Sequence, residues 1–249
     1  MALSDEAIAR YARHLVLPEI GGPGQQRLLS ARILIIGAGG IGSPALLYLA
    51  AAGIGRIGLV DDDTVDLSNL QRQILHTSDR IGQPKTESAA TSTLALNPST
   101  LLDLFPERLT AERAQEIVPQ YDVVLDGTDN GPTRQLVAQA AQAAGKPLVS
   151  AAAIQFSGQL TTFKPYLGRP HPCFACLHAS LPGEENCTTL GVLGAAVGVV
   201  GSLAAVEVIK EILGIGDSLS GTLLLYDALD AGITRIRLPR RKDCPGCGG

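Results

Sequence analysis

Tryptophan is absent from the 249-residue sequence, and aromatic residues make up only 4% of it. Since 45% of the residues are hydrophobic, which is typical of a globular protein, the core is expected to consist of Leu, Val, Ile and Ala. A basic surplus is also missing, because the formal net charge is −4. Proteins that bind nucleic acids usually carry strongly basic surfaces, so the composition argues against a nucleic-acid partner.

The sequence shows no export signal, because the acidic segment Ser4–Glu6 is not followed by an apolar stretch. The longest apolar run, Leu190–Val206, is shorter than the ~20 residues that cross a bilayer. This run is rich in Gly and Ala, so we expect a helix buried in protein. Gly194, Gly198 and Ser202 recur every four residues and predict one helix face in close backbone contact. A cytoplasmic protein without membrane association is expected.

Cysteine is scarce but unevenly placed. Four of the five cysteines form two C-x-x-C pairs, whereas Cys187 stands alone. Without an export signal, metal binding explains such pairs better than disulfides do. Two pairs supply the four thiolates of a tetrahedral structural zinc site, with His171 and His178 as alternative ligands. The predicted zinc ligands are Cys173, Cys176, Cys244 and Cys247.

Strand and helix patterns alternate along most of the chain, which predicts right-handed βαβ crossovers. The predicted fold class is α/β: a Rossmann-like, mostly parallel sheet with helices on both faces, C-terminal antiparallel strands and a zinc-stapled loop. That loop is the Pro-, Gly- and Cys-rich segment 165–189. Strands are expected at 32–36, 56–60, 100–105, 121–125, 147–151, 155–163, 221–227 and 232–238, and helices at 5–17, 40–52, 84–96, 110–116, 131–144 and 190–213.

A glycine-rich loop, Gly37–Gly42, follows the first expected strand and opens a helix. Such a loop lets the backbone approach a nucleotide phosphate at a helix N-terminus. Asp61 ends the next strand about twenty residues later, where a ribose-binding acid is expected. A dinucleotide does not need the following block, Ser68–Gln73, whose Asn, Gln and Arg predict contacts with further phosphates. The sequence therefore favours ATP over a redox cofactor.

More polar residues are expected at the same carboxyl edge of the sheet, where ligands of parallel sheets bind. Asp129, after the strand 121–125, is interpreted as a Mg²⁺ ligand or as a helix N-cap, because Pro132 suits a first helical turn. Lys85 is expected at a helix start, where a cation opposes the macrodipole. Pairing with Glu87 or exposure would explain that position, but a bound phosphate explains it better.

Motifs of one known family cover nearly the whole chain: Arg10–His14, Gly37–Gly42, Asp61–Asp63, Leu67–Gln73, Gln83–Lys85, Leu125–Asn130, Cys173–Cys176, Cys187 and Cys244–Cys247. The chain resembles the ThiF/MoeB/HesA family of E1-like adenylyltransferases, and looks closest to ThiF. It departs from the family at Gly127, where members commonly have Cys. The resemblance implies one domain, 1–249. This comprises an N-terminal helical arm (1–30), a nucleotide-binding half (31–153) and a carrier-binding half (154–249) with a crossover loop (165–189).

The resemblance also implies an activity: ATP-dependent adenylylation of the C-terminal Gly-Gly carboxylate of a small ubiquitin-like sulfur carrier, in thiamine or molybdopterin biosynthesis. It implies ATP, Mg²⁺, structural Zn²⁺, a homodimer, and a sulfurtransferase or cysteine desulfurase as a further partner. Arg13 would reach the γ-phosphate region of the other subunit. Cys187 would lie on the crossover loop, where in some members it forms an acyl disulfide with the carrier.

The residues expected to act in catalysis are Arg13, Arg72, Lys85, Asp129 and Cys187. Those expected to contact the nucleotide are Gly37, Gly39, Gly40, Gly42, Asp61, Asp63, Ser68, Asn69, Leu70, Gln71, Arg72, Lys85, Asp129 and Asn130.

Three other functions stay open. An NAD-dependent oxidoreductase would use the glycine loop and Asp61, but it leaves Arg72, Lys85 and Asp129 without a role. A non-enzymatic zinc-stapled binding module would explain only the cysteines. An E1-like dehydratase that adenylates a modified tRNA base is disfavoured by the acidic net charge and the two C-x-x-C pairs.

Overall fold

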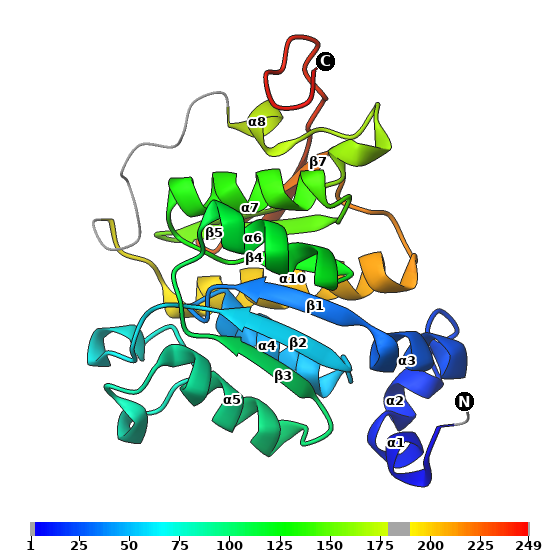
Figure 1. Ribbon diagram of the computed structural model, residues 1–249, viewed down its shortest axis with the longest axis vertical. Coiled ribbons are helices and arrows are strands. Elements are labelled where there is room, and N and C mark those ends of the chain that lie inside the picture. The colour runs from blue at the N-terminus through cyan, green and yellow to red at the C-terminus, as the bar shows by residue number, and fades with distance from the viewer. Residues whose placement is uncertain (1–2, 179–189, 249) are drawn as a thin grey trace.

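The computed structural model describes residues 3–178 and 190–248. Its strands form one eight-stranded sheet in the order β3-β2-β1-β4-β5-β6-β7-β8. Strands β1 to β5 are parallel, while β5 to β8 pair antiparallel, so the predicted fold class is confirmed (Figure 1). The strands are β1 (Arg32–Ile36), β2 (Arg56–Val60), β3 (Leu101–Phe105), β4 (Val123–Asp126), β5 (Leu148–Ile154), β6 (Ser157–Phe163), β7 (Thr222–Asp227) and β8 (Gly232–Arg237).

Helices cover both faces of this sheet, as the alternating pattern predicts. Residues of α4, α5 and α10 pack with β1 and β2 in one apolar core, and residues of α6 and α7 pack on the opposite face. Among the described helices, none is long and apolar enough to cross a membrane. The described helices are α1 (Asp5–Arg10), α2 (Ala12–Leu15), α3 (Gly21–Ser30), α4 (Gly42–Ala51), α5 (Lys85–Leu96), α6 (Ala111–Ile117), α7 (Gly131–Ala143), α8 (Phe174–Leu177) and α10 (Gly194–Leu213).

The N-terminal arm differs from the single helix expected at 5–17. The helix is interrupted at Tyr11, whose buried side chain accepts a hydrogen bond from Asn97 Nδ2 at 3.0 Å. The sequence pattern does not predict helix α3, because its first four residues are Gly, Gly, Pro and Gly. Tertiary contacts override that local preference: Gln25 Nε2 donates to the Ala52 carbonyl, and Arg27 donates to the Leu213 carbonyl.

Helix α10 begins at Gly194, not at residue 190 as expected, because the backbone of residues 191–193 is hydrogen-bonded to Gln155 instead. The prediction that Gly194, Gly198 and Ser202 form a helix face in close backbone contact is also only partly correct. A Cβ on Gly194 would lie 2.3 Å from the Gln71 carbonyl oxygen, whereas the space beside Gly198 is open. Gly201 provides the second close approach, because a Cβ there would lie 2.5 Å from the Ile41 carbonyl oxygen.

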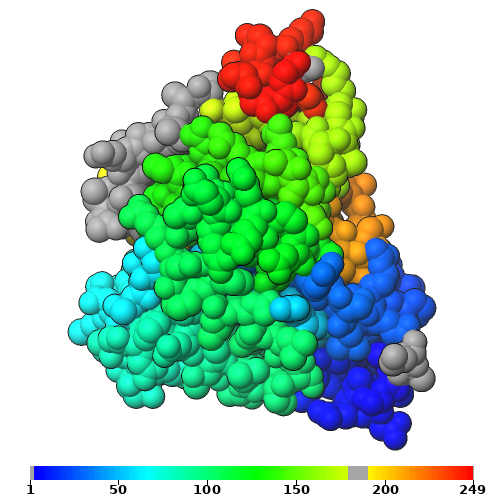
Figure 2. All heavy atoms as spheres, in the orientation of Figure 1, coloured from blue at the N-terminus to red at the C-terminus, as the bar shows by residue number. Residues whose placement is uncertain are grey.

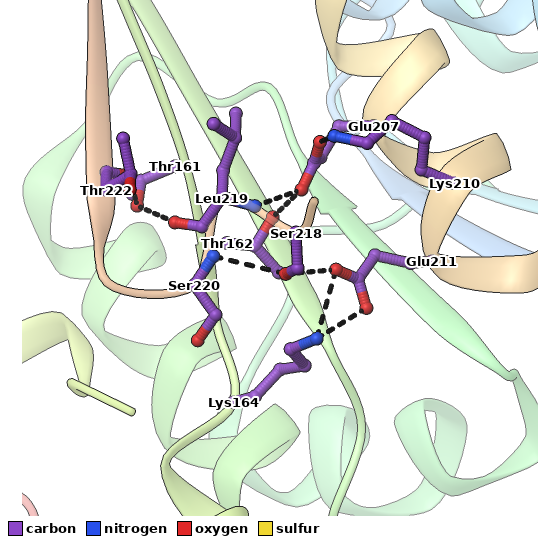
Figure 3. A network of polar contacts seen from close by, with 10 residues as sticks. All are labelled: Thr161, Thr162, Lys164, Glu207, Lys210, Glu211, Ser218, Leu219, Ser220 and Thr222. Carbon is purple, nitrogen blue, oxygen red and sulfur yellow. Dashed lines mark hydrogen bonds and ion pairs between the residues drawn. The ribbon is translucent and has the colours of Figure 1, made fainter. Parts of the chain in front are cut away.

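A buried polar network joins the last turns of α10 to β6 and to the segment before β7 (Figure 3). Glu207 accepts hydrogen bonds from Thr162 Oγ1 at 2.8 Å and from the Leu219 N–H at 2.7 Å. Glu211 forms an ion pair with Lys164 at 3.0 Å. Since both carboxylates are almost fully buried and have partners, they fix the helix against the antiparallel half of the sheet.

Candidate functional site

A cavity of about 600 Å³ opens at the carboxyl ends of β1, β2 and β4 and continues along β5, β6 and β7. It lies at the edge where parallel sheets bind ligands. Most of the sequence-predicted nucleotide residues line it: Gly37, Gly39, Gly40, Asp61, Asp63, Arg72, Lys85, Asp129 and Asn130. Gly42, Ser68, Asn69, Leu70 and Gln71 do not line it.

The glycine loop leaves no room for a side chain at Gly40 or Gly42. Gly37 has a φ of +95°, which L-residues rarely adopt. A Cβ on Gly42 would lie 1.9 Å from the Gly37 carbonyl oxygen, and one on Gly40 would lie 2.7 Å from Val197 Cγ1. The N–H groups of Gly39 and Gly40 have no acceptor within the described part of the chain. The loop therefore presents free donors before the start of α4, as a phosphate site requires.

Asp61 holds this loop from the neighbouring strand. Its two carboxylate oxygens accept the Ala38 N–H at 2.7 Å and the Asp63 N–H at 2.9 Å. Burial raises the pKa of Asp61, although the charge of Lys85 and the two N–H groups act in the opposite direction. Its position fits the predicted ribose contact, and it also has a structural task that the sequence pattern did not predict.

Lys85 is the first residue of α5 and is buried, so simple exposure does not explain its position. Its Nζ donates to Asp63 Oδ2 at 2.7 Å rather than to Glu87. Both residues line the cavity, which places a cation beside the glycine loop. The sequence pattern indicates Lys85 but not its partner, because the two residues lie on separate segments that only the fold brings together.

Only the end of the block Ser68–Gln73 lines the cavity. Its first residues form a short 3₁₀ helix in which Asp66 accepts the Ser68 N–H at 2.8 Å and the Asn69 side chain accepts the Asp66 N–H. These side chains cap the turn. Arg72 lines the cavity, where its Nη1 also donates to the Ser68 carbonyl at 3.0 Å. The turn thus presents a guanidinium to the site.

The loop after β4 is built on the fully buried Asp126. Its carboxylate accepts hydrogen bonds from Thr128 Oγ1 at 2.7 Å and from Ser150 Oγ at 3.1 Å. Asn130, not Asp129, is the N-cap of α7, because its side chain accepts the Thr133 N–H. The N-cap interpretation of Asp129 is therefore wrong, and its exposed carboxylate lines the cavity.

One predicted catalytic residue, Arg13, is not brought to the cavity, and another is not described by the structure. Arg13 is exposed on α2 and is not among the residues that line it. Cys187 lies outside the described residues.

The four predicted zinc ligands converge. The Cys173–Cys244 and Cys176–Cys247 sulfur atoms are 3.5 and 3.7 Å apart, and all four lie within 4.8 Å of one another. A tetrahedron with Zn–S bonds of 2.3 Å separates its sulfurs by roughly 3.8 Å, so the spacing of the cluster is close to the one that a zinc ion requires. The C-terminal segment lies against residues 165–178 (Figure 2). His171 Nδ1 instead contacts Ser220 Oγ, so it is not part of the cluster.

Several residues that line or support the cavity are absent from the sequence-based expectations. Glu107 and Arg108 follow β3 at the carboxyl edge, so the rule that found Asp61 could have found them. Arg134 donates to the Thr128 and Ala151 carbonyls, and no local pattern indicates this. His76 is buried behind the loop, where burial lowers its pKa, assisted by the charges of Lys85 and Arg80.

Comparison with known proteins places these features in a family. Residues 11–246 match the ThiF family. The chain is 46% identical over 253 residues to "Sulfur carrier protein adenylyltransferase" of Thermus thermophilus, covering all of this chain and 93% of the relative. It is 50% identical over 251 residues to "Adenylyltransferase and sulfurtransferase MOCS3" of Bos taurus. That match covers 99% of this chain but only 54% of the relative, so the chain spans about half of that protein.

A solved structure shares the fold. The crystal structure of E. coli MccB with MccA-N7isoASN superposes with a TM-score of 0.83 at 24% identity, covering 96% of this chain and 75% of that one. This similarity supports the architecture alone. The match over residues 11–246 and the relatives of nearly half identical sequence show that the chain belongs to the ThiF family.

Proposed function

We propose that the protein uses ATP to adenylylate the C-terminal Gly-Gly carboxylate of a small ubiquitin-like sulfur carrier and releases pyrophosphate. One observation carries the proposal: free loop N–H groups, a guanidinium and a buried ammonium converge on one cavity, at Gly39, Gly40, Arg72 and Lys85. These donors suit a triphosphate. A nicotinamide dinucleotide carries only a diphosphate, so it gives the two cations less phosphate charge to neutralise than a triphosphate does. Relatives named as sulfur-carrier adenylyltransferases support the same reaction.

The nucleotide would lie across the carboxyl edge of the sheet. Asp61 would bind the ribose hydroxyls in the cavity that it lines together with the segment Glu107–Leu109. The phosphates would extend along the glycine loop toward Arg72 and Lys85. Asp129 would hold Mg²⁺, which supplies further charge neutralisation on the phosphate oxygens when bound.

The reaction needs little acid–base chemistry. The carrier's terminal carboxylate attacks the α-phosphorus of ATP, the bond to the bridging oxygen breaks, and pyrophosphate leaves with that electron pair. A carboxylate is already a nucleophile, so no general base is required. Arg72 and Lys85 would stabilise the charge that develops on the phosphate oxygens, and the cavity would align the two reactants.

The second half of the cavity fits a narrow extended tail. It runs past Ala152, Ile154 and Gln159 at the ends of β5 and β6, and past Val192 and Leu225. Most of these side chains are apolar, so we propose that they contact the uncharged backbone of the carrier's tail. We assign the carrier to the half 154–249; the predicted crossover loop, 165–189, lies partly outside the described residues. Thiamine or molybdopterin synthesis in the cytoplasm, with a sulfurtransferase or desulfurase as sulfur donor, fits such a carrier.

A second copy of the chain is the proposed occupant of an apolar groove between α4 and α10. Tyr48, Ile74 and Val206 are exposed there, and Gly198 leaves space for a partner to approach. A homodimer through this face would also explain why Arg13 is exposed and does not line the cavity of its own subunit. Arg13 would complete the phosphate site of the partner.

The experiment is ATP–pyrophosphate exchange with purified carriers. Exchange should require a carrier with an intact Gly-Gly end, and removing the last glycine from the same carrier is the matched control. Exchange of equal rate without any carrier, or hydride transfer from NADH, would contradict the proposal.

A further inference from the structure

His76 lies behind the nucleotide loop and bonds to it directly. The imidazole is 5% exposed, and its Nε2 is 3.0 Å from the carbonyl oxygen of Ala38. Its Nδ1 is 2.9 Å from Ser88 Oγ on α5. Ser88 is one turn after Lys85, so the histidine connects the glycine loop to the helix that carries the cavity's buried cation.

The Ala38 carbonyl fixes the direction of these hydrogen bonds. A carbonyl oxygen only accepts, so the proton of the neutral imidazole resides on Nε2, which donates to Ala38. Nδ1 then accepts from the Ser88 hydroxyl. Arg80 Nη1 supplies a further donor here, because it donates to the Ser88 carbonyl at 2.7 Å and approaches Ser88 Oγ at 3.4 Å. The burial of the ring and the positive charges of Lys85 and Arg80 lower the pKa of His76 and keep it neutral.

The bond to Ala38 determines where the next N–H points. In a trans peptide the C=O and the following N–H point in opposite directions. The carbonyl of Ala38 points to His76, so the N–H of Gly39 points away from it. Gly39 lines the cavity, and its N–H has no acceptor in the described part of the chain. Asp61 holds the Ala38 N–H at 2.7 Å, so the backbone is fixed on both sides of Ala38.

We propose that His76 is a positioning residue for the nucleotide: by holding the Ala38 carbonyl, it keeps the Gly39 N–H directed at a phosphate group of ATP. The inference rests on the proposed function, because it concerns the same nucleotide site. His76 itself does not line the cavity, so it acts through the peptide and not on the substrate.

Two variants separate positioning from packing. The amide nitrogen of Gln in His76→Gln can replace Nε2 and keep the bond to Ala38. In His76→Asn the shorter side chain can replace Nδ1 and keep only the bond to Ser88. We expect His76→Asn to raise the KM for ATP about tenfold, which corresponds to loss of one buried hydrogen bond, and His76→Gln to raise it less than about threefold. The KM for the carrier should change in neither variant.

Calorimetric titration of each variant with a non-hydrolysable ATP analogue gives a second readout that needs no carrier. An analogue affinity that is at least about threefold weaker in His76→Asn than in His76→Gln supports the inference, even if the wild type shows no carrier-dependent exchange and the proposed function fails. Equal affinities in the two variants would overturn it, whatever their melting temperatures. So would a change confined to the KM for the carrier.

Discussion

Lys85 Nζ lies 2.7 Å from Asp63 Oδ2, and the two side chains differ sharply in exposure: that of Lys85 is 6% exposed and that of Asp63 is 67% exposed. The ammonium is removed from water, while its partner keeps most of its hydration. One carboxylate therefore compensates the buried cation only in part, and the remaining N–H groups of Lys85 can serve an anion in the cavity.

Replacing this cation should affect catalysis more than stability. We expect Lys85→Met to lower kcat/KM for ATP by about 100-fold or more, since it removes a charge that neutralises phosphate. The free energy of unfolding in urea should change by less than about 1 kcal/mol, because Met fills the site and no buried charge has to be desolvated. Arg72→Ala is the matched comparison with a less buried side chain. Loss of activity that follows loss of stability in both variants would indicate a structural role instead.

Subunit mixing tests the action of Arg13 across a dimer. Arg13→Ala and Asp129→Ala homodimers should each be nearly inactive in pyrophosphate exchange. A mixed dimer has one cavity with both functional residues, so mixing should restore up to about a quarter of wild-type activity after statistical exchange of subunits. The control is mixing under conditions in which labelled subunits do not exchange. No recovery despite demonstrated exchange would count against action in trans.

Zinc removal should loosen the C-terminal segment and spare the nucleotide site. Anaerobically purified protein should contain one zinc per chain, and Cys244→Ser should lose it and melt at a lower temperature. Binding of an ATP analogue should persist, because the cysteine cluster shares no residue with the cavity lining. Metal analysis that finds no zinc in the wild type would refute this prediction.

The lowered pKa of His76 predicts a pH-dependent stability. In the unfolded chain His76 takes up a proton near its ordinary pKa of 6.5, whereas the folded protein resists this. The unfolding free energy should therefore decrease as the pH falls from about 7.5 to about 5.5, and this contribution should be constant above that range. His76→Gln removes this term, so its stability should decrease less over the same interval in urea titrations. Parallel curves for the two proteins would disprove the assignment.

Cys187 lies outside the described residues, so its prediction rests on the sequence. We expect Cys187→Ser to keep pyrophosphate exchange, because adenylylation needs no thiol. In a reconstituted pathway with a sulfur donor, the same variant should transfer less sulfur to the carrier. Unchanged sulfur transfer would leave Cys187 as an idle thiol.

Much of the fold follows from local pattern, and the exceptions have specific causes. The parallel strands and the polar residues along their carboxyl edge were predictable, since Gly37, Asp61 and Asp129 each follow an apolar run. The cysteine cluster was predictable from spacing alone. Helix α3 was not, because its Gly-rich start is stabilised by contacts with distant segments such as Ala52.

Local sequence pattern also predicts only part of the site. Side chains that follow strands were predictable, but those that support the loop from behind were not. His76 and Ser88 carry no motif, and their hydrogen bonds join segments that are separate in sequence. Asp63 was predictable as a nucleotide contact, whereas its ion pair with Lys85 depends on where the fold places the start of α5. The hydrogen bonds and the ion pair that local sequence does not predict are therefore determined by the tertiary fold.

The hydrogen bonds from Arg27 to the end of α10 have a consequence for how the chain folds. Arg27 and Leu213 are 186 residues apart, so the arm cannot dock fully until Leu213 has left the ribosome. Closing so large a loop is entropically costly and slows folding relative to local pairing. The parallel half and the contacts of the arm with Ala52 and Asn97 can form during synthesis, whereas the contact of Arg27 with α10 forms later. Newly made chains therefore pass through a stage in which the N-terminal arm is only partly docked and more accessible to proteases and chaperones.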